Sequence, residues 1–300
     1  MRHFLSLLDF NKQELYQLIN RAIELKAMYK NAQAITPMNK KVLGMIFEKS
    51  STRTRVSFET AAIQFGGGSI FLSPSETQLG RGEPIEDSAR VLSSMVDIIM
   101  IRTAAHERLI QFAQYSKVPV INALTDFNHP CQLLADIMTF IELKGDIKGK
   151  NICYIGDGNN MCNSWMNAAY QFEFNLNIAC PKGYEPDGNL LKKYADFVQL
   201  TDLPHKAIKD ADCVVTDVWA SMGQEDEQKQ RKQDFKGFMV SERLMKLTRD
   251  DAIFMHCLPA HRGEEVAAVV IDGKQSVVWQ EAENRLHAQK SLIEFLLTNN

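Results

Sequence analysis

The sequence lacks several features that would point to a particular class of protein. It has no run of about 18 consecutive apolar residues, which is the length that a membrane-spanning helix needs. Its formal net charge is −3 over 300 residues and it has no block of basic residues, so nucleic acid and anionic membranes are poor candidates for its main partner. Its first residues contain no apolar signal-peptide core, and we expect a cytoplasmic protein.

Cysteine is scarce, and its spacing argues against the common cysteine-based sites. The six cysteines form no Cys-x-x-Cys pair, and Cys153 and Cys213 lie within apolar runs, where cysteine packs as a small hydrophobe. Reduced thiols are therefore expected. The nearest thing to a metal motif is the group His256, Cys257 and His261, which lacks a usual ligand spacing, so we expect no metal site.

Short apolar runs alternate with helical patterns along the whole chain. Strands are predicted at 42–47, 69–72, 98–101, 118–121, 151–155, 175–180, 212–216 and 252–256. Helices are predicted at 11–30, 53–65, 86–94, 105–116, 131–144, 161–173, 188–197, 241–247, 264–270 and 281–298. This alternation is typical of parallel sheets with helices on both faces. Two sets of four strands predict an α/β protein with two doubly wound domains, residues 1–134 with 283–300 and residues 135–282, joined by interdomain helices. The stretches 73–84 and 220–237 are predicted to be polar loops.

Polar residues follow most of the predicted strands, where open α/β sheets bind their ligands. Ser51-Thr52-Arg53-Thr54-Arg55 comes between the strand 42–47 and the helix 53–65. The start of a helix attracts anions, and hydroxyl and guanidinium donors suit a phosphate, so this stretch is interpreted as an anion cradle. The alternative is an ordinary Ser/Thr helix cap with two solvated arginines.

Two further positions in the first half could serve the same ligand. Arg102 directly follows the strand 98–101, as a second phosphate contact or as a structural ion-pair partner. His129-Pro130 places proline at the first position of the helix 131–144. His129 could then donate to a carbonyl oxygen that gains negative charge, with Gln132 beside it, although a capping histidine is the simpler interpretation.

The second half favours an amino-acid ligand over a dinucleotide. Gly156-Asp157-Gly158 is followed by Met161 where a third small residue belongs, and no acid follows the strand 175–180, so the dinucleotide fingerprint fails. Asn159 and Asn160 at a helix start suit a carboxylate, and Asp217 at a strand end suits an ammonium group. Cys257 fits beside a ligand amine better than in a dyad with His256, because adjacent strand residues point to opposite sides.

Four motifs together resemble the aspartate/ornithine carbamoyltransferase family over essentially the whole chain. Ser51-Thr52-Arg53-Thr54-Arg55 and His129-Pro130-Cys131-Gln132 are motifs of the whole family. Asp217-Val218-Trp219-Ala220-Ser221-Met222-Gly223 and His256-Cys257-Leu258-Pro259-Ala260-His261-Arg262-Gly263 are similar to motifs of its ornithine branch. The resemblance implies transfer of a carbamoyl group from carbamoyl phosphate to the side-chain amine of L-ornithine, which yields L-citrulline and phosphate.

The resemblance also implies site residues and partners. The residues implied to bind carbamoyl phosphate are Ser51, Thr52, Arg53, Thr54, Gln78, Arg102, His129, Pro130, Cys131, Gln132, Cys257, Leu258 and Arg285. Those implied to bind ornithine are Asn160, Asp217, Ser221 and Met222. Those implied to act in catalysis are Arg53, Arg102, His129, Asp217 and Cys257. No metal or organic cofactor is implied, and the expected assembly is a homotrimer, with higher assembly left open.

Other functions are weighed against this one. A transferase for putrescine or an N-acylornithine would share the cradle, but Asp217 suits the free α-ammonium group of ornithine. A non-catalytic scaffold on the same fold and a dehydrogenase are the remaining alternatives. Arginine biosynthesis is the expected setting, although the same chemistry serves arginine breakdown.

Overall fold

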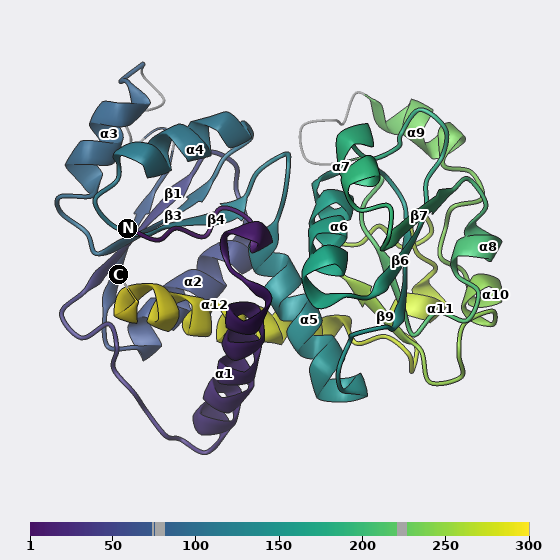
Figure 1. Cartoon of the computed structure of the whole chain (residues 1–300), viewed down its shortest axis with the longest axis horizontal. Coiled ribbons are helices and arrows are strands. Elements are labelled where there is room, and N and C mark those ends of the chain that lie inside the picture. The colour runs from purple at the N-terminus through teal and green to yellow at the C-terminus, as the bar shows by residue number, and fades with distance from the viewer. Residues whose placement is uncertain (74, 76–81, 221–226, 300) are drawn as a thin grey trace. The chain divides into compact units, whose positions relative to one another are not determined.

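The computed structural model describes residues 1–73, 75, 82–220 and 227–299 (Figure 1). The chain divides into two compact units, which we call unit 1 (Met1–Met138 with Glu283–Asn300) and unit 2 (Thr139–Ala282). Each unit holds one parallel sheet with helices, so the expected α/β fold with two doubly wound domains is confirmed. Helices α5 (Pro130–Lys144) and α12 (Val278–Thr298) carry the chain from one unit to the other.

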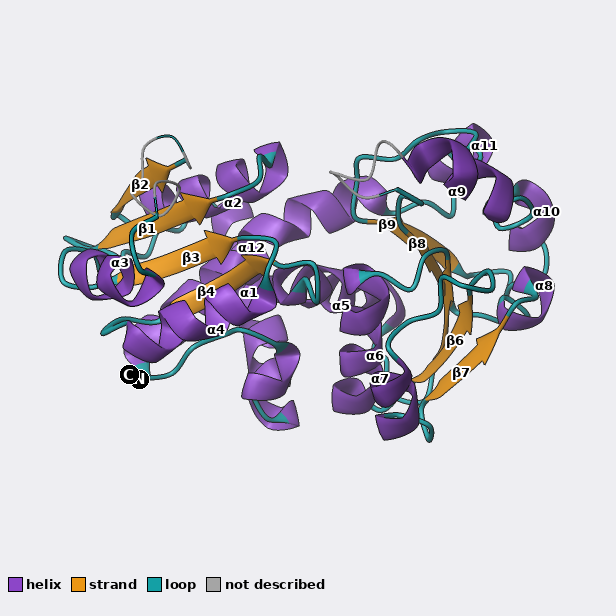
Figure 2. Cartoon of the chain, turned by 90° about the horizontal axis from the view of Figure 1, so that it is seen from above, coloured by secondary structure: helices purple, strands orange, loops and turns teal. Residues whose placement is uncertain are grey.

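Unit 1 begins with a short 3-10 helix and a long α-helix and then alternates strands with helices. From its start to the beginning of α5, its elements are η1 (Leu7–Asp9), α1 (Lys12–Lys30), β1 (Val42–Phe47), α2 (Thr52–Gln64), β2 (Gly68–Leu72), α3 (Ile85–Leu92), β3 (Ile98–Arg102), α4 (His106–Tyr115) and β4 (Val120–Leu124). The strand order is β2-β1-β3-β4 and every pairing is parallel, as the arrows in Figure 2 show. The strand predicted at 118–121 begins later, at Val120, because Pro119 has no N–H for the ladder.

Both faces of the first sheet are covered by helices. Ile46, Ile99 and Ile101 point to one face and pack with Leu109 and Phe112 of α4. Helix α2 contacts β1 and β2, and its Phe58, Ala61 and Ala62 are fully buried. The apolar side chains on both faces of this sheet are therefore covered by helices.

Unit 2 repeats the architecture with one strand more than predicted. Its elements are β5 (Asn151–Ile155), α6 (Asn160–Phe172), β6 (Asn175–Ala179), α7 (Gly188–Lys193), β7 (Val198–Thr201), α8 (Pro204–Ala207), β8 (Cys213–Thr216), α9 (Gln228–Asp234), α10 (Glu242–Met245), β9 (Ile253–His256) and α11 (Ala268–Ile271). The order is β7-β6-β5-β8-β9, again all parallel. The prediction of four strands was wrong because β7 is an edge strand in which only Val198 is buried, which leaves little apolar signal.

The core of unit 2 explains a second difference from the prediction. Phe235 is fully buried together with Val214, Phe254 and Ile271. It directly follows α9, a helix inside the stretch 220–237 that was predicted to be a polar loop. A buried aromatic residue at the end of the segment lets this charged helix form against the core.

Two findings bear on the environment of the protein. Within the ranges that the structure describes, no helix combines the length and the apolar character needed to cross a membrane. The six cysteines carry thiols and not disulfides, and five of them are buried.

Candidate active site

Both sheets have a point where the order of strands reverses, and the candidate residues lie there. In unit 1, β2 lies on one side of β1 and β3 on the other; in unit 2, β6 and β8 flank β5. Ligands of open α/β sheets bind outside the carboxyl ends of the strands at such a point. The stretch 51–55 follows β1 and Arg102 ends β3, whereas Asn159 follows β5 and Asp217 follows β8.

The start of α2 is organised by hydroxyl groups. Ser51 is the N-cap residue, and its Oγ accepts a hydrogen bond from the Thr54 backbone N at 3.4 Å and donates to Thr54 Oγ1 at 3.0 Å. Arg285 from α12 also donates to Thr54 Oγ1, at 3.1 Å. Ser51 therefore does cap the helix, as the simpler alternative predicted, but a buried guanidinium group beside the cap is more than a cap requires.

The two arginines of this stretch have different surroundings. Arg55 is exposed, lies over the Phe71 ring at 3.9 Å and pairs with Glu59 at 3.2 Å. Arg53 is only partly exposed, and its carbonyl oxygen accepts a hydrogen bond from Ser57 Oγ at 2.7 Å. Arg55 is thus held on the outer surface of unit 1 by its own contacts, which separates it from the candidate site.

Arg102, Arg285 and His129 form a buried cationic neighbourhood in unit 1. All three side chains are almost completely buried. Burial, followed by the charges of Arg285 and Arg102, holds the pKa of His129 well below its ordinary value of 6.5. His129 is therefore neutral at pH 7, and a neutral imidazole brings one N–H donor without adding a third charge.

The residues after His129 have distinct partners. Pro130 is the first residue of α5, where its missing N–H costs nothing. The Cys131 thiol donates to the Asn122 carbonyl at 3.2 Å, and burial raises the pKa of Cys131 to about 12, so it is an inert thiol. Gln132 Nε2 donates to Asp136 Oδ1 at 2.8 Å.

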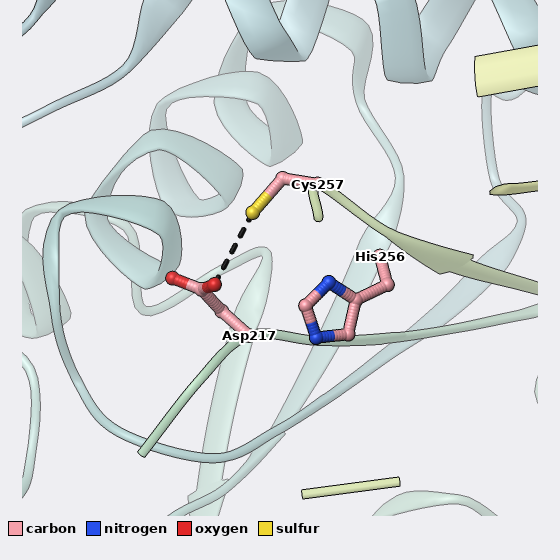
Figure 3. A group of neighbouring side chains, drawn as sticks. All are labelled: Asp217, His256 and Cys257. Atoms are coloured by element: carbon pink, nitrogen blue, oxygen red, sulfur yellow. Dashed lines mark hydrogen bonds between the residues drawn. The ribbon is translucent and has the colours of Figure 1, made fainter. Parts of the chain in front are cut away.

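In unit 2, three strand ends bring Asn159, Asp217 and Cys257 together. Asp217 Oδ1 accepts from the Cys257 thiol at 3.2 Å (Figure 3). It also accepts from the Val218 backbone N at 2.8 Å. Asp217 Oδ2 accepts from Asn159 Nδ2 at 3.0 Å. Asn160, one residue after Asn159, begins α6. The result is a nearly buried carboxylate held in one orientation by three donors.

His256 lies beside Asp217 and Cys257, but its ring nitrogens form hydrogen bonds to other residues. Asp217, His256 and Cys257 offer ligand atoms within 4.8 Å of one another (Figure 3). However, His256 Nδ1 accepts from the Leu258 backbone N at 2.9 Å, so Nε2 carries the proton and donates to Glu265 Oε1 at 3.1 Å. Neither ring nitrogen keeps a lone pair for a metal, and the Cys257 thiol turns to Asp217 rather than to the imidazole.

Gly158, the second glycine after β5, is required by the packing of the protein's own backbone. A Cβ placed on Gly158 would lie 2.2 Å from the Pro186 backbone N and 2.4 Å from the Glu185 carbonyl carbon. The Gly158 backbone N also donates to the Tyr184 carbonyl at 2.8 Å. The close backbone approach that Gly158 permits is therefore made by the protein's own chain, and not by a pyrophosphate.

The sequence did not point to a buried ion pair next to this site. Arg231 of α9 lies in the stretch predicted to be a polar loop, but it is buried and its Nη1 donates to Asp157 Oδ2 and to the Trp219 carbonyl, both at 2.8 Å. Burial raises the pKa of Asp157 to about 6, although Arg231 acts in the opposite direction. Phe235 behind α9 was the available signal that this charged segment packs against the core.

The roles of all the candidate residues stay predictions. Gln78, Ser221 and Met222 lie outside the described residues. Thr52 is exposed, and Leu258 is partly exposed with a left-handed backbone (φ 55°). The structure brings the remaining candidates together in two groups, one in each unit.

Comparison with known proteins also finds two domains, although the second domain model includes the segment 283–296 that belongs to unit 1 of the structure. Residues 2–142 match the aspartate/ornithine carbamoyltransferase carbamoyl-P binding domain, and residues 148–296 match the Asp/Orn binding domain of the same family. A curated ornithine carbamoyltransferase from Acinetobacter baumannii is 60% identical over 300 residues, covering 100% of this chain and 98% of that protein. The crystal structure of ornithine carbamoyltransferase from Burkholderia thailandensis is 51% identical with a TM-score of 0.93, covering 99% of each chain. The anabolic ornithine carbamoyltransferase from Campylobacter jejuni is 43% identical with a TM-score of 0.94, covering 100% of each chain.

Proposed function

The chain belongs to the aspartate/ornithine carbamoyltransferase family, and we propose that it transfers the carbamoyl group of carbamoyl phosphate to the side-chain amine of L-ornithine. The products are L-citrulline and phosphate. The observation that carries the choice of ornithine is the bond between Asp217 and Cys257, because it joins the two motifs of the ornithine branch in one place.

Unit 1 is the proposed carbamoyl phosphate domain. Ser51, Thr52, Arg53 and Thr54 at the start of α2 bind the phosphate through hydroxyls, backbone N–H groups and a guanidinium group. Arg102 and Arg285 add positive charge, and Gln78 is assigned here by resemblance. His129 donates to the carbonyl oxygen of the carbamoyl group, and Gln132 holds the same group. Cys131 has its thiol bonded to Asn122, so Pro130 and Cys131 contribute through the backbone.

Unit 2 is the proposed ornithine domain. Asn160 at the start of α6 suits the α-carboxylate, and Asp217 suits an ammonium group. Ser221 and Met222 are assigned by resemblance, as is the contact of Cys257 and Leu258 with the carbamoyl group. The carboxylate of Asp217 is held in one orientation by three donors of the protein itself, which reduces the reorganisation needed on binding.

The reaction is an acyl transfer without a covalent enzyme intermediate. The side-chain amine has an ordinary pKa of about 10.4 and must lose a proton before it attacks. Its nitrogen then forms a bond to the carbamoyl carbon, the bond from that carbon to the phosphate oxygen breaks, and the electron pair leaves with phosphate. The second amine proton is lost to solvent or to phosphate. Arg53, Arg102 and neutral His129 stabilise the negative charge that develops on the carbonyl and phosphate oxygens.

A product assay tests the proposal and its main alternative together. Purified protein is given carbamoyl phosphate with L-ornithine, putrescine or N-acetylornithine, and ureido product and phosphate are measured. We expect citrulline and phosphate in equal amounts from ornithine and much slower turnover of the other two amines. A non-catalytic scaffold predicts no product with any amine from pH 7 to 9, and preference for putrescine would reassign Asp217.

The proposed setting is a homotrimer in the cytoplasm that serves arginine biosynthesis. Val56 and Ile63 on α2 and Ile70 on the edge strand β2 are about half exposed or more, which supports an interface between copies. The presence of six cysteine thiols without a disulfide supports a reducing compartment. The Campylobacter jejuni relative, described as anabolic, supports the biosynthetic direction. Sedimentation equilibrium should give three times the chain mass of 34.0 kDa.

A further inference from the structure

A buried carboxylate on α5 lies one helical turn beyond Gln132. Asp136 and Gln132 are each 1% exposed, and Gln132 Nε2 donates to Asp136 Oδ1 at 2.8 Å. Residues four apart lie on the same side of a helix, so both side chains share one face of α5. A carboxyl group in such a place is costly to bury unless it has a defined partner.

The carboxylate determines which end of the Gln132 amide faces it. The amide nitrogen donates and the carboxyl oxygen accepts in this bond, so the NH₂ end of the amide faces Asp136. The two ends of a primary amide point in different directions from the same carbon. The carbonyl oxygen Oε1 is therefore directed away from Asp136 for as long as this bond persists.

Gln132 lies next to the groups assigned to the carbamoyl donor within unit 1. His129 is three residues earlier on the same helix start, and its carbonyl accepts from the Gln132 backbone N at 3.1 Å. The charges of Arg285 and Arg102 lower the pKa of His129, and Arg285 donates a hydrogen bond to Thr54 of the phosphate cradle. The Gln132 amide is thus one helical turn or less from a group that we assign to the carbamoyl carbonyl.

We propose that Asp136 is a positioning residue that orients the Gln132 amide so that Oε1 accepts a hydrogen bond from the NH₂ group of the bound donor. This inference rests on the proposed function and adds a basis for donor selectivity. Carbamoyl phosphate carries an NH₂ group where acetyl phosphate carries a methyl group. A carbonyl oxygen at this point accepts a hydrogen bond from carbamoyl phosphate and none from acetyl phosphate. A reversed Gln132 amide would instead place its NH₂ group against the NH₂ group of carbamoyl phosphate.

Ligand binding without ornithine tests this assignment. Carbamoyl phosphate, acetyl phosphate and inorganic phosphate are titrated into the wild-type protein and into the Asp136→Asn, Gln132→Ala and doubly substituted variants. Asparagine keeps the shape of Asp136 but can donate or accept, so the Gln132 amide loses its fixed direction. We expect Asp136→Asn to weaken carbamoyl phosphate by about tenfold, the value of roughly one hydrogen bond, with acetyl phosphate and inorganic phosphate within about twofold.

The double variant separates orientation from a merely structural role. If Asp136 acts through Gln132, Asp136→Asn changes carbamoyl phosphate binding by less than about twofold in the Gln132→Ala background. Equal weakening of all three ligands, no weakening of carbamoyl phosphate, or the same loss in both backgrounds would each overturn the proposal. So would a wild-type protein that binds acetyl phosphate as tightly as carbamoyl phosphate. These outcomes are independent of whether citrulline forms, so failure here differs from failure of the proposed function.

Discussion

The donor side of unit 1 and the acceptor side of unit 2 use opposite chemistry. Unit 1 gathers guanidinium groups, hydroxyls and a helix start around a neutral histidine, which suits a phosphate anion. Unit 2 gathers a carboxylate and a thiol, with Asp217 as the charged centre, which suits an ammonium group. Each side therefore matches one of the two proposed substrates, and substitutions on the two sides should affect different substrates.

The largest expected effect comes from removing one cation of the donor side. Arg53→Ala should lower kcat/KM by about 100- to 1000-fold, the usual loss when one group that stabilises developing negative charge is removed. The matched control is Arg55→Ala, because Arg55 belongs to the same motif but is occupied with Glu59 and Phe71 on the surface. The control should stay within about threefold in steady-state assays. Equal losses in both variants would show that the cradle acts through overall charge.

Removing the charge of the acceptor side should affect the other substrate. Asp217→Asn keeps the shape of the side chain but loses a charge-assisted contact, so kcat/KM for ornithine should fall by about 10- to 100-fold. The dissociation constant of carbamoyl phosphate, measured without ornithine, should change by less than about twofold. A large loss of carbamoyl phosphate binding in this variant would break the division into two sides.

The fold was largely predictable because six of the nine described strands have at most one residue that is not buried. The strand Val42–Phe47 was predicted with its observed ends, since five of its six residues are buried and the apolar run stands out. Strand β7 was missed for the opposite reason, because at the edge of a sheet Gln199 and Leu200 can face solvent. Helix α9 was missed because its segment is polar and charged, and the buried Phe235 at its end is a single apolar residue with no helical pattern around it.

The two sides of the candidate site also differ in how far they could be predicted from the sequence. The cradle is one continuous stretch at a helix start, so its residues and their chemistry could be interpreted together from the sequence. The link between Asp217 and Cys257 joins residues 40 positions apart and exists only because β8 and β9 are neighbours. The Asp136–Gln132 bond lies within one helix, but its meaning depends on the burial of both side chains, which the sequence does not state.

Titration of His129 should sharpen the comparison on the donor side. Its pKa is depressed in the folded protein, so the unfolded chain binds more protons at mildly acidic pH. The stability that neutral His129 contributes is complete above its unfolded pKa of about 6.5 and is lost as the pH falls below it. The thermal midpoint of His129→Gln should therefore gain on that of the wild type as the pH falls from about 6.5 to 5. A Tm difference that does not change with pH would show that His129 is not held neutral.

The smallest effect should come from Asp157 in unit 2, and it should have the opposite sign. Its pKa is raised to about 6 by burial, against the effect of Arg231, and Asp217 and Glu227 raise it further. The folded protein then binds more protons than the unfolded chain between about pH 4 and 6, so the stability of the wild type falls as the pH rises through this window. Asp157→Asn cannot ionise, and its Tm should gain on the wild type as the pH rises, by about 2–4 °C for each 1 kcal/mol. Below about pH 4 the difference should level off. If the Tm of Asp157→Asn instead fell relative to the wild type as the pH rose, the bond to Arg231 would outweigh the effect of burial on the pKa of Asp157. Asp157 would then be stabilised by charge pairing, in the same way as a carboxylate at the surface.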